Sequence, residues 1–445
     1  MKTILQYLQD KGYSPASDDT TKYHDTWLSW YQGYVKDFHH YTVYNGIEMV
    51  GKDRYGLGMA KTVCEDWASL LLNEKVKIYT GKRFDKELEK VFEYNNFRVK
   101  GNQLIELTFA LGTGALVEYK DATGEVVIDY IRAEMIYPLS WDNGYVNECA
   151  FGSMRERNGK RQYYIQIHRL NEQELYVIEN HIVDAESGAD LDLDEGMLPE
   201  VDTGIEIPLF QIITPNIVNN IDLDSPYGIS VFGNAIPQLK GCDIIYDSYI
   251  NEFDLGKKRI MVPLSMAKIE MGKDGVARPV FDKNDTVFYA LPGDRNSEGK
   301  LDTFDPQIRA DEHDKGITKA LDLLSFKCGM GTGRYRFENG TVKTATEVIS
   351  EKSELYQSLK KHEIVLESAL KGLVKAIGRL KGVKIEDVNI DFDDSIIEDK
   401  VSERQTDRQD VAMGVMPLWE YRMKWYGEDE ETAKANIPEQ ADIIL

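Results

Sequence analysis

The sequence predicts an α+β fold, with helices and strands in separate stretches of the chain. Residues 115–215 are rich in β-branched and aromatic residues and are divided by turn sequences, which is typical of an antiparallel meander. Residues 1–110 carry apolar side chains at helical spacing, and residues 345–381 carry a much longer helical stripe. Strand-rich and helix-rich stretches that do not alternate favour α+β over a parallel α/β fold.

The N-terminal part is expected to be helical and well packed. Trp27, Trp30, Tyr31 and Tyr34 cluster at helical spacing, which favours a place in the core, and a second helix is expected at residues 58–73. Within the meander we expect three strands, separated by turn sequences: 115–119, 125–131 and 162–169, with turns at 121–124, 142–144 and 158–159. Residues 184–195 are expected to form an acidic loop.

Two helices separated by a short strand-containing segment are predicted next. The first spans residues 236–256, carries one apolar stripe and ends at Gly256. The second spans residues 306–328, with Asp305 as its N-cap and Pro306 as its first residue. Short strands and loops fill the residues between them.

The longest predicted helix begins at a capping box, Thr344 to Glu347, and runs through residues 345–381. At 1.5 Å per residue it would extend about 55 Å, and a helix of that length needs partners along its whole course. A strand at 388–392 and further helices, one of them capped by Ser395 and Glu398, are expected after it.

Composition restricts the function. The chain has 445 residues, with 53 basic and 76 acidic side chains and a net charge of −23, a surface that on average repels nucleic acid. This balance argues against tight binding of nucleic acid over a large surface and leaves room only for a few local basic contacts. The four cysteines form no CxxC pair, and the longest uncharged stretch, 207–221, is too short to cross a membrane.

No catalytic motif is present, and we predict no catalytic residue, metal site or cofactor. The phosphate-binding GxxxxGK[ST] loop and the HExxH and GxSxG motifs are missing, and Gly329–Gly333 follows a predicted helix rather than a strand. Asp190, Asp192 and Asp194 begin like a calcium loop but lack its later glycine and glutamate, so a solvated loop is expected.

Two basic clusters remain as candidate binding residues. Lys257, Lys258 and Arg259 follow a helix, where they either offset the helix dipole or contact a partner. The other cluster lies on a glycine-bearing loop, and there a mobile contact with a polyanion competes with simple solvation. Its residues are Arg334, Tyr335, Arg336 and Lys343.

The order of elements resembles the portal proteins of tailed bacteriophages, of the siphophage type. The resemblance covers nearly the whole chain. Lys343–Val348, with the sequence Lys-Thr-Ala-Thr-Glu-Val, is its most specific stretch, and Tyr227–Phe232, Lys257–Ile260 and Phe392–Ile397 support it.

The resemblance implies a portal fold of wing, stem, clip and short helical crown. Its regions would be an N-terminal wing at 1–235, stem helices at 236–256 and 306–328, a clip at 257–305, a tunnel loop at 329–343, a long wing helix at 344–382, and a wing strand with crown-like helices at 383–445. Arg334, Tyr335, Arg336 and Lys343 would then be DNA contacts of the tunnel loop. Lys257, Lys258 and Arg259 would form the base of the clip.

The resemblance also implies partners and a place in the virion. Twelve copies would form a ring at one capsid vertex, through which double-stranded DNA passes, after assembly in the host cytoplasm. The ring would bind the terminase large subunit, then the head–tail connector or adaptor, and the major capsid and scaffolding proteins, with no membrane partner. Two alternatives stay open: another phage or tailocin-like assembly protein, and an acidic metal-dependent hydrolase using Asp391, Asp393 or Asp394.

Overall fold

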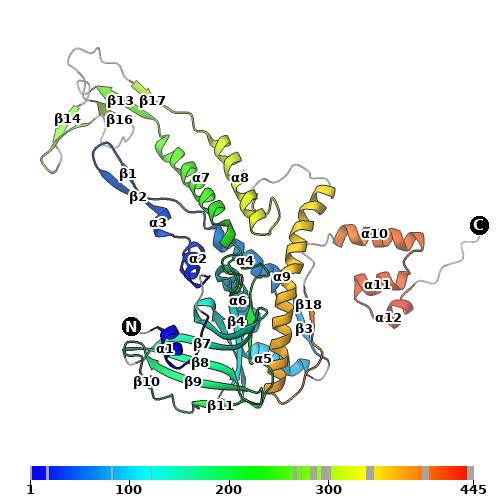
Figure 1. The fold of residues 1–445 in the computed structure, drawn as a ribbon. Coiled ribbons are helices and arrows are strands. Elements are labelled where there is room, and N and C mark those ends of the chain that lie inside the picture. Colours follow the sequence, from blue (N-terminus) through cyan, green and yellow to red (C-terminus); the bar gives the residue numbers. More distant parts are fainter. Residues whose placement is uncertain are drawn as a thin grey trace, which may run out of the picture.

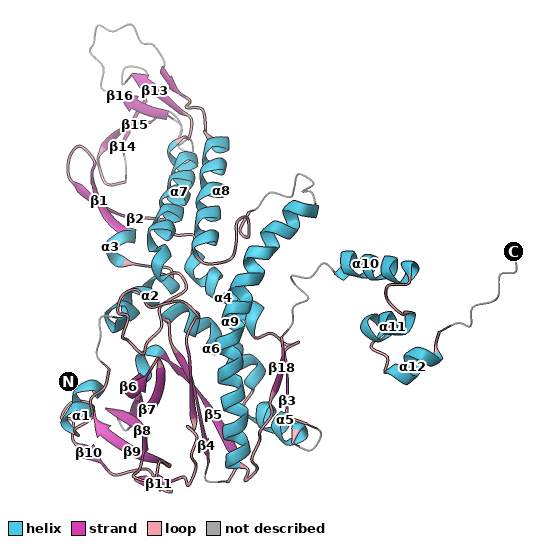
Figure 2. Ribbon diagram, turned by 45° about the vertical axis from the view of Figure 1, so that its right-hand side comes forward, coloured by secondary structure: helices cyan, strands magenta, loops and turns pink. Residues whose placement is uncertain are grey.

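The fold was analysed in a computed structural model. It describes residues 3–437 except for these gaps: 17–19, 82–83, 122, 158, 264–267, 272, 281–287, 292–301, 337–344 and 393–399. The molecule has a mixed helix-and-sheet body, a pair of antiparallel helices that projects from it, small strands beyond that pair, and a group of C-terminal helices that stands apart (Figure 1). Figure 2 shows the same parts by secondary structure. The α+β class is confirmed.

Most of the N-terminal helices pack around the main core, whereas the first one packs on the meander. They are α1 (Ile4–Asp10), α2 (His24–Tyr31), α3 (Lys36–His39), α4 (Met59–Leu71), α5 (Asp85–Tyr94) and α6 (Phe97–Leu111). Trp27, Trp30 and Trp67 are buried in this core, as their helical spacing predicted, although Tyr34 is half exposed. The 3₁₀ turn η1 (Thr20–Tyr23) leads into α2.

A β-hairpin interrupts these helices, and the sequence analysis did not predict it. Strands β1 (His40–Tyr44) and β2 (Met49–Asp53) pair in antiparallel register, so His39 ends α3 while His40 begins a strand. The turn is built by Asn45, whose side-chain oxygen accepts the amides of Ile47 and Glu48 at 2.9 Å each, and by Gly46 at φ 97°. Asn-Gly between strand formers is the signal that was overlooked.

The predicted meander is confirmed, but its strands divide between two sheets. One sheet has the order β10-β9-β8-β7-β6, with β11 also on β9; the other has the order β12-β4-β5. The strands are β4 (Gly114–Lys120), β5 (Val126–Arg132), β6 (Ile136–Asp142), β7 (Tyr145–Arg157), β8 (Lys160–Leu170), β9 (Tyr176–Asp184), β10 (Asp190–Leu191), β11 (Glu200–Asp202) and β12 (Phe210–Ile213). The 3₁₀ turn η2 (Ala133–Met135) joins β5 to β6.

Two glycines let the chain return closely from the sheets to the projecting helices. Gly112 ends α6 at φ 87°, and a Cβ there would meet the carbonyl oxygen of Gly228 at 2.5 Å. A Cβ on Gly228 would meet the Gly112 oxygen at 2.2 Å. The backbone contact between them explains the glycine in the Tyr227–Phe232 stretch, since any side chain would push the segments apart.

The projecting pair consists of α7 (Ile236–Leu255) and α8 (Ala310–Lys327), and the short η3 (Gly233–Ala235) precedes α7. The segment between them contains β13 (Arg259–Pro263), which pairs in parallel with β16 (Phe288–Leu291) and antiparallel with β17 (Asp302–Phe304), and a hairpin of β14 (Lys268–Met271) and β15 (Ala277–Val280).

Helix α8 begins at Ala310, so the predicted start at Asp305 and Pro306 is wrong. Its N-cap is Arg309, whose backbone amide donates to Glu252 of α7 at 3.3 Å. The Arg309 guanidinium donates to both oxygens of the same carboxylate, at 3.0 and 2.8 Å. A side chain from the neighbouring helix therefore fixes where α8 begins, and no local sequence rule could show it.

The long helix α9 (Ala345–Leu380) has nearly the predicted bounds, while its predicted cap, Thr344, lies outside the described residues. After it, β18 (Asn389–Asp391) pairs with β3 (Lys77–Tyr79), which confirms the predicted strand. The C-terminal helices are α10 (Lys400–Met413), α11 (Leu418–Tyr426) and α12 (Glu430–Ala435). Ser395 and Glu398 lie outside the described residues. No helix in the described part of the chain has the length and apolar run needed to cross a bilayer.

Candidate functional site

The glycine-bearing loop after α8 is a tight turn held against the body. Gly329, Gly331 and Gly333 all adopt positive φ, at 76°, 71° and 85°. The Ser325 hydroxyl donates to the Gly331 carbonyl at 2.6 Å, and the Trp67 indole donates to the Cys328 carbonyl at 3.1 Å. The loop therefore reverses direction within a few residues, as only glycines allow without strain.

Both arginines of this loop lie in two-point ion pairs. The Arg334 guanidinium donates to Asp66 of α4 at 3.1 and 3.4 Å, and the Arg336 guanidinium donates to Asp322 of α8 at 2.8 and 2.6 Å. The side chain of Asp322 is only 9% exposed, so the second pair is the more deeply held. The charge of residues 329–336 is thus matched by one carboxylate from each of two helices.

Tyr335 lies between the two arginines and points into the core, where its ring packs against the main apolar cluster. Burial is the main cause that raises the pKa of Tyr335, and the nearby Asp66 carboxylate raises it further. Lys343, the fourth residue predicted for this site, lies outside the described residues. The structure thus brings together Arg334, Tyr335 and Arg336, with only the arginines at the surface.

The second basic cluster lies at the opposite end of the helix pair, because α7 ends there while α8 ends at the glycine loop (Figure 1). Lys257 pairs with Asp254 at 2.6 Å, and Lys258 pairs with Asp305 at 3.4 Å. The Lys257 contact is the main cause that lowers the pKa of Asp254. Arg259 opens β13. Each lysine therefore has a local acidic partner, beside the C-terminal end of a helix.

The acidic residues of the predicted loop are engaged by basic and phenolic groups. Asp190 accepts from the Tyr7 hydroxyl at 2.6 Å and from Lys11 at 2.7 Å, while Asp194 pairs with Arg155 at 2.7 Å and with Arg157. Arg155 is the first cause that lowers the pKa of Asp194. The side chains of Asp190 and Asp194 stay 51% and 30% exposed, as a solvated loop predicts, while their contacts tie the segment to α1 and β7.

The described residues contain no group of three or more potential metal ligands. Asp391 lies in β18, while Asp393 and Asp394 lie outside the described residues. Cys64, Cys149, Cys242 and Cys328 are buried as free thiols.

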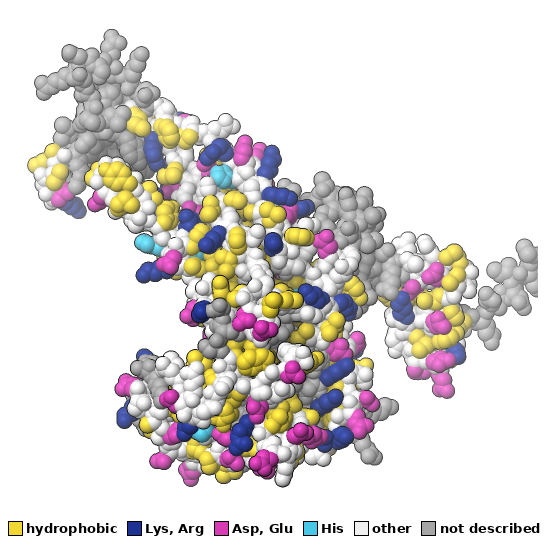
Figure 3. Space-filling model, viewed as in Figure 1, with side chains coloured by type: hydrophobic (Ala, Val, Ile, Leu, Met, Phe, Trp, Pro, Cys, Tyr) yellow, Lys and Arg dark blue, Asp and Glu magenta, His cyan; other side chains and the backbone are white. Residues whose placement is uncertain are grey.

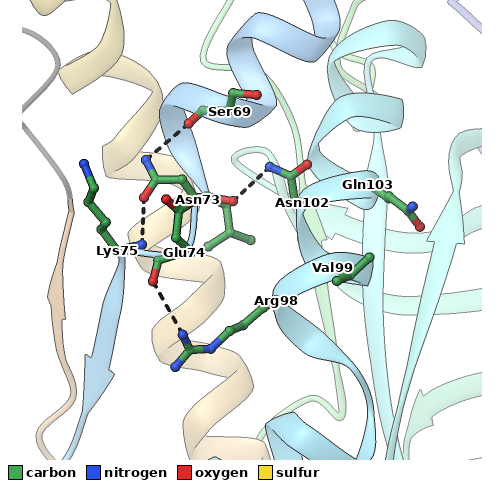
Figure 4. Close-up of a pocket in the computed structure, with 9 residues that line it drawn as sticks. Ser69, Asn73, Glu74, Lys75, Arg98, Val99, Asn102 and Gln103 are labelled. Carbon is green, nitrogen blue, oxygen red and sulfur yellow. Dashed lines mark hydrogen bonds between the residues drawn. The ribbon is translucent and has the colours of Figure 1, made fainter.

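Two surface pockets are lined partly by polar side chains. One, of about 930 Å³, lies between the meander and the C-terminal end of α9, where Tyr164 donates to Asn180 at 2.8 Å. The other, of about 510 Å³, lies at the end of α4 (Figure 4). There Asn102 donates to the carbonyls of Ala68 and Leu72, at 3.0 and 2.9 Å. These hydrogen bonds use backbone carbonyls at the C-terminal end of α4. They do not place a nucleophilic side chain beside a base.

A buried polar network at the base of α7 was missed by the sequence analysis. Asp243 accepts the Leu57 amide at 2.7 Å, and Asp247 accepts the Tyr55 amide at 3.0 Å. The Nδ1 of His39 lies 2.8 Å from the Val35 amide nitrogen, and its Nε2 lies 3.2 Å from the Asp243 carboxylate. Burial is the main cause that raises the pKa of Asp243. Two acids four residues apart on a mostly apolar helix were the available signal.

Apolar side chains are exposed along the helix pair and the hairpin. Figure 3 shows hydrophobic atoms at the surface in this half of the molecule. The exposed residues are Val43, Tyr44, Ile47 and Met49 on the hairpin, Ile244, Phe253 and Leu255 on α7, and Leu323 and Phe326 on α8. Exposed apolar surface of this extent is typical of a protein interface.

Comparison with known proteins completes this description. The family model "Phage portal protein, SPP1 Gp6-like" matches residues 13–441. No curated protein matches the chain. A solved structure described as "Neck of native GTA particle computed with C12 symmetry" is similar at 13% identity and a TM-score of 0.46, over 82% of this chain and 89% of that chain. At that TM-score the likeness carries nothing further for this protein.

The family match decides between the hypotheses. It covers almost the full length of the chain, including the projecting helix pair and the glycine loop. The hydrolase alternative is wrong, because the matched family is structural and non-enzymatic. The chain belongs to the SPP1 Gp6-like family of phage portal proteins, structural components of the virion.

Proposed function

We propose that this chain assembles into a ring of twelve at one capsid vertex and forms the conduit for genome packaging and ejection. In this proposal α7 and α8 are the stem, β13–β17 belong to the clip, residues 329–343 form the tunnel loop, α9 is the long wing helix and α10–α12 are crown-like. The ring would bind the terminase large subunit at the clip during packaging, and the head–tail connector afterwards.

One observation carries the proposal: the subunit leaves its helix pair apolar and uncovered. Leu323 and Phe326 of α8 are 49% and 57% exposed, and Leu255 of α7 is 54% exposed. Exposing such side chains to water is unfavourable by about 25 cal/mol for each square ångström, so a second surface should cover them. Head-to-tail contacts between copies cover such surfaces and close into a ring when the rotation permits.

The two ends of the helix pair support different roles. The loop end carries the two arginines and lies beside residues 354–361 of α9, while the opposite end carries the small strands and the lysines (Figure 1). In a ring, every copy would present the same loop to the central axis. Every copy would also present the same strands to the protein that binds the ring from outside. Phosphate contacts from a few arginines are independent of sequence, as a moving genome requires.

The test is the mass and shape of the purified protein. We expect light scattering and negative-stain images to show a ring with a central channel, of twelve copies or a near neighbour. Replacing both Leu323 and Phe326 with serine should shift the population toward smaller species. Leu198→Ser is the matched control, because Leu198 is 60% exposed but lies in the meander, far along the chain from the helix pair. A monomer at every salt and protein concentration would rule out the ring.

A further inference from the structure

The basic loop is matched by acids that the sequence does not place near it. Residues 329–336 contain two arginines and no acid, so the segment alone carries two positive charges. Asp66 and Asp322 supply one negative charge for each arginine. They come from separate helices, α4 and α8, and from positions 268 and 14 residues away from their partners.

The geometry of both pairs is specific. In each, the Nε and one terminal nitrogen of the guanidinium face the two oxygens of one carboxylate, at 2.6–3.4 Å. This side-on arrangement fixes the plane of the guanidinium as well as its position. Because Tyr335 is anchored in the core between them, the two arginines cannot move together as a free arm.

We infer that Asp66 and Asp322 are positioning residues for DNA contact: they hold Arg334 and Arg336 in place and share their charge. This inference rests on the proposed conduit function. DNA phosphates passing the loop would meet guanidiniums that already have a carboxylate partner, so each new contact must compete with an existing one. Binding is therefore weaker and more easily exchanged than to unpaired arginines, which suits a substrate that must keep moving.

The two pairs should differ in strength. The side chains of Arg334 and Asp66 are 34% and 26% exposed, so water and salt weaken their attraction. Asp322 is 9% exposed and would be left as a buried charge if Arg336 moved away, which resists the exchange. Arg334 is thus the arginine that a phosphate can capture first, and Arg336 the one that stays in place.

The experiment measures binding of purified rings to double-stranded DNA as a function of salt. Asp66→Asn and Asp322→Asn keep the size of the side chain and remove its charge. We expect each to tighten binding several-fold at low salt and to steepen the salt dependence, because an uncompensated guanidinium releases more counterions when it meets a phosphate. In packaging assays with the motor, the same variants should move DNA more slowly.

Two controls separate charge sharing from a purely structural role. Asp66→Glu retains the charge and should bind DNA as the unmodified ring does. The double variant Asp66→Asn with Arg334→Gln removes both charges and should return the salt dependence to at or below its original slope. If Asp322 is needed for folding, every variant at Asp322 would lower the yield of rings. The variants at Asp66, which is more exposed, would then decide the result alone.

The outcomes distinguish this inference from the proposed function. If Arg334→Gln with Arg336→Gln weakens DNA binding while both Asp→Asn variants match the unmodified ring, the positioning role is wrong and the loop contact stands. If rings form but neither the arginine nor the aspartate variants change DNA binding or packaging, the loop does not contact DNA and both ideas fail. Tighter binding in Asp66→Asn that Arg334→Gln abolishes is the result we expect.

Discussion

Helix α9 buries most of its apolar side chains within the subunit, whereas the α7–α8 pair leaves several of its apolar side chains exposed. In the second half of α9, Leu373, Val374 and Ile377 are all fully buried against the body. The pair buries Leu239 and Cys242 near the base of α7, but Phe253 and Leu255 near the far end of that helix are 42% and 54% exposed. The subunit thus completes its core along the C-terminal part of α9 and leaves the projecting pair for another surface to complete.

The length of the apolar stripe on α9 predicted partners along the whole course of the helix. Strands β4 and β12 and helix α4 of the same subunit supply a large part of them. Gly372 marks how close this packing is, since a Cβ there would lie 1.9 Å from the Gln211 side chain. Stripe length alone does not indicate an interface; the exposure of the stripe does.

The largest effect is expected in the buried half of α9. Leu373→Ala should lower the free energy of unfolding by about 2–5 kcal/mol, because it removes a fully buried side chain and leaves a cavity. Urea unfolding of dissociated subunits measures this change. A loss below about 1 kcal/mol would mean that the α9 contact is not a close-packed core.

The next effect concerns the anchor at the base of α7. Asp243→Ala leaves the Leu57 amide and the His39 ring without their acceptor, at a cost of about 1–3 kcal/mol for a buried unsatisfied group. Asp243→Asn keeps an acceptor and should retain most of the stability. Hydrogen exchange should quicken at residues 54–57 in the alanine variant only. Equal exchange in both variants would contradict the role of this network.

A third effect depends on pH. Burial against Trp67 and Phe109 lowers the pKa of His362 to about 3, so the folded chain binds its proton more weakly than the unfolded chain does. Its contribution to stability is present above pH 6.5 and is lost as the pH falls toward 3, by up to about 1.4 kcal/mol for each pH unit. His362→Gln should make unfolding less dependent on pH in this window. An unchanged slope would show that the ring is not buried in solution.

The smallest effect on the subunit itself is expected on the exposed face of α8. Leu323→Ala should change the free energy of unfolding of the dissociated subunit by less than about 0.5 kcal/mol. The same variant should lower the stability of the assembled ring, as measured by dissociation on dilution. If Leu323→Ala destabilised the dissociated subunit as much as Leu373→Ala does, Leu323 would be packed within one chain. The contrast between α9 and the helix pair would then be wrong.

Local sequence rules predicted much of the fold. Apolar spacing predicted α4, α7 and α9, because a helix with one buried face has apolar residues at every third or fourth position. Turn residues predicted the β6–β7 and β7–β8 turns in the same way. The division of strands between two sheets and the start of α8 at Ala310 depended on contacts between distant segments, and the hairpin after His39 depended on an overlooked Asn-Gly.

The candidate site shows the same limit more clearly. Three glycines and two arginines marked the loop after α8, because glycines permit a tight reversal of the chain and arginines are candidate phosphate contacts. Nothing near residue 334 in the sequence indicates that Asp66 lies beside it, because that pairing arises only when α4 packs against the loop. Charge at the loop is therefore a property of the folded subunit and could not be read from the segment itself.

The support of α9 along its later turns has a mechanical consequence. The helix is 36 residues long, which at 1.5 Å per residue is about 54 Å, and its buried residues from Leu359 onward are embedded in the body. A rod held along most of its length passes a load to whatever holds it. A push on the described part of the glycine loop, which lies beside Ser358 of α9, would therefore be carried by the helix to the sheet of β12, β4 and β5.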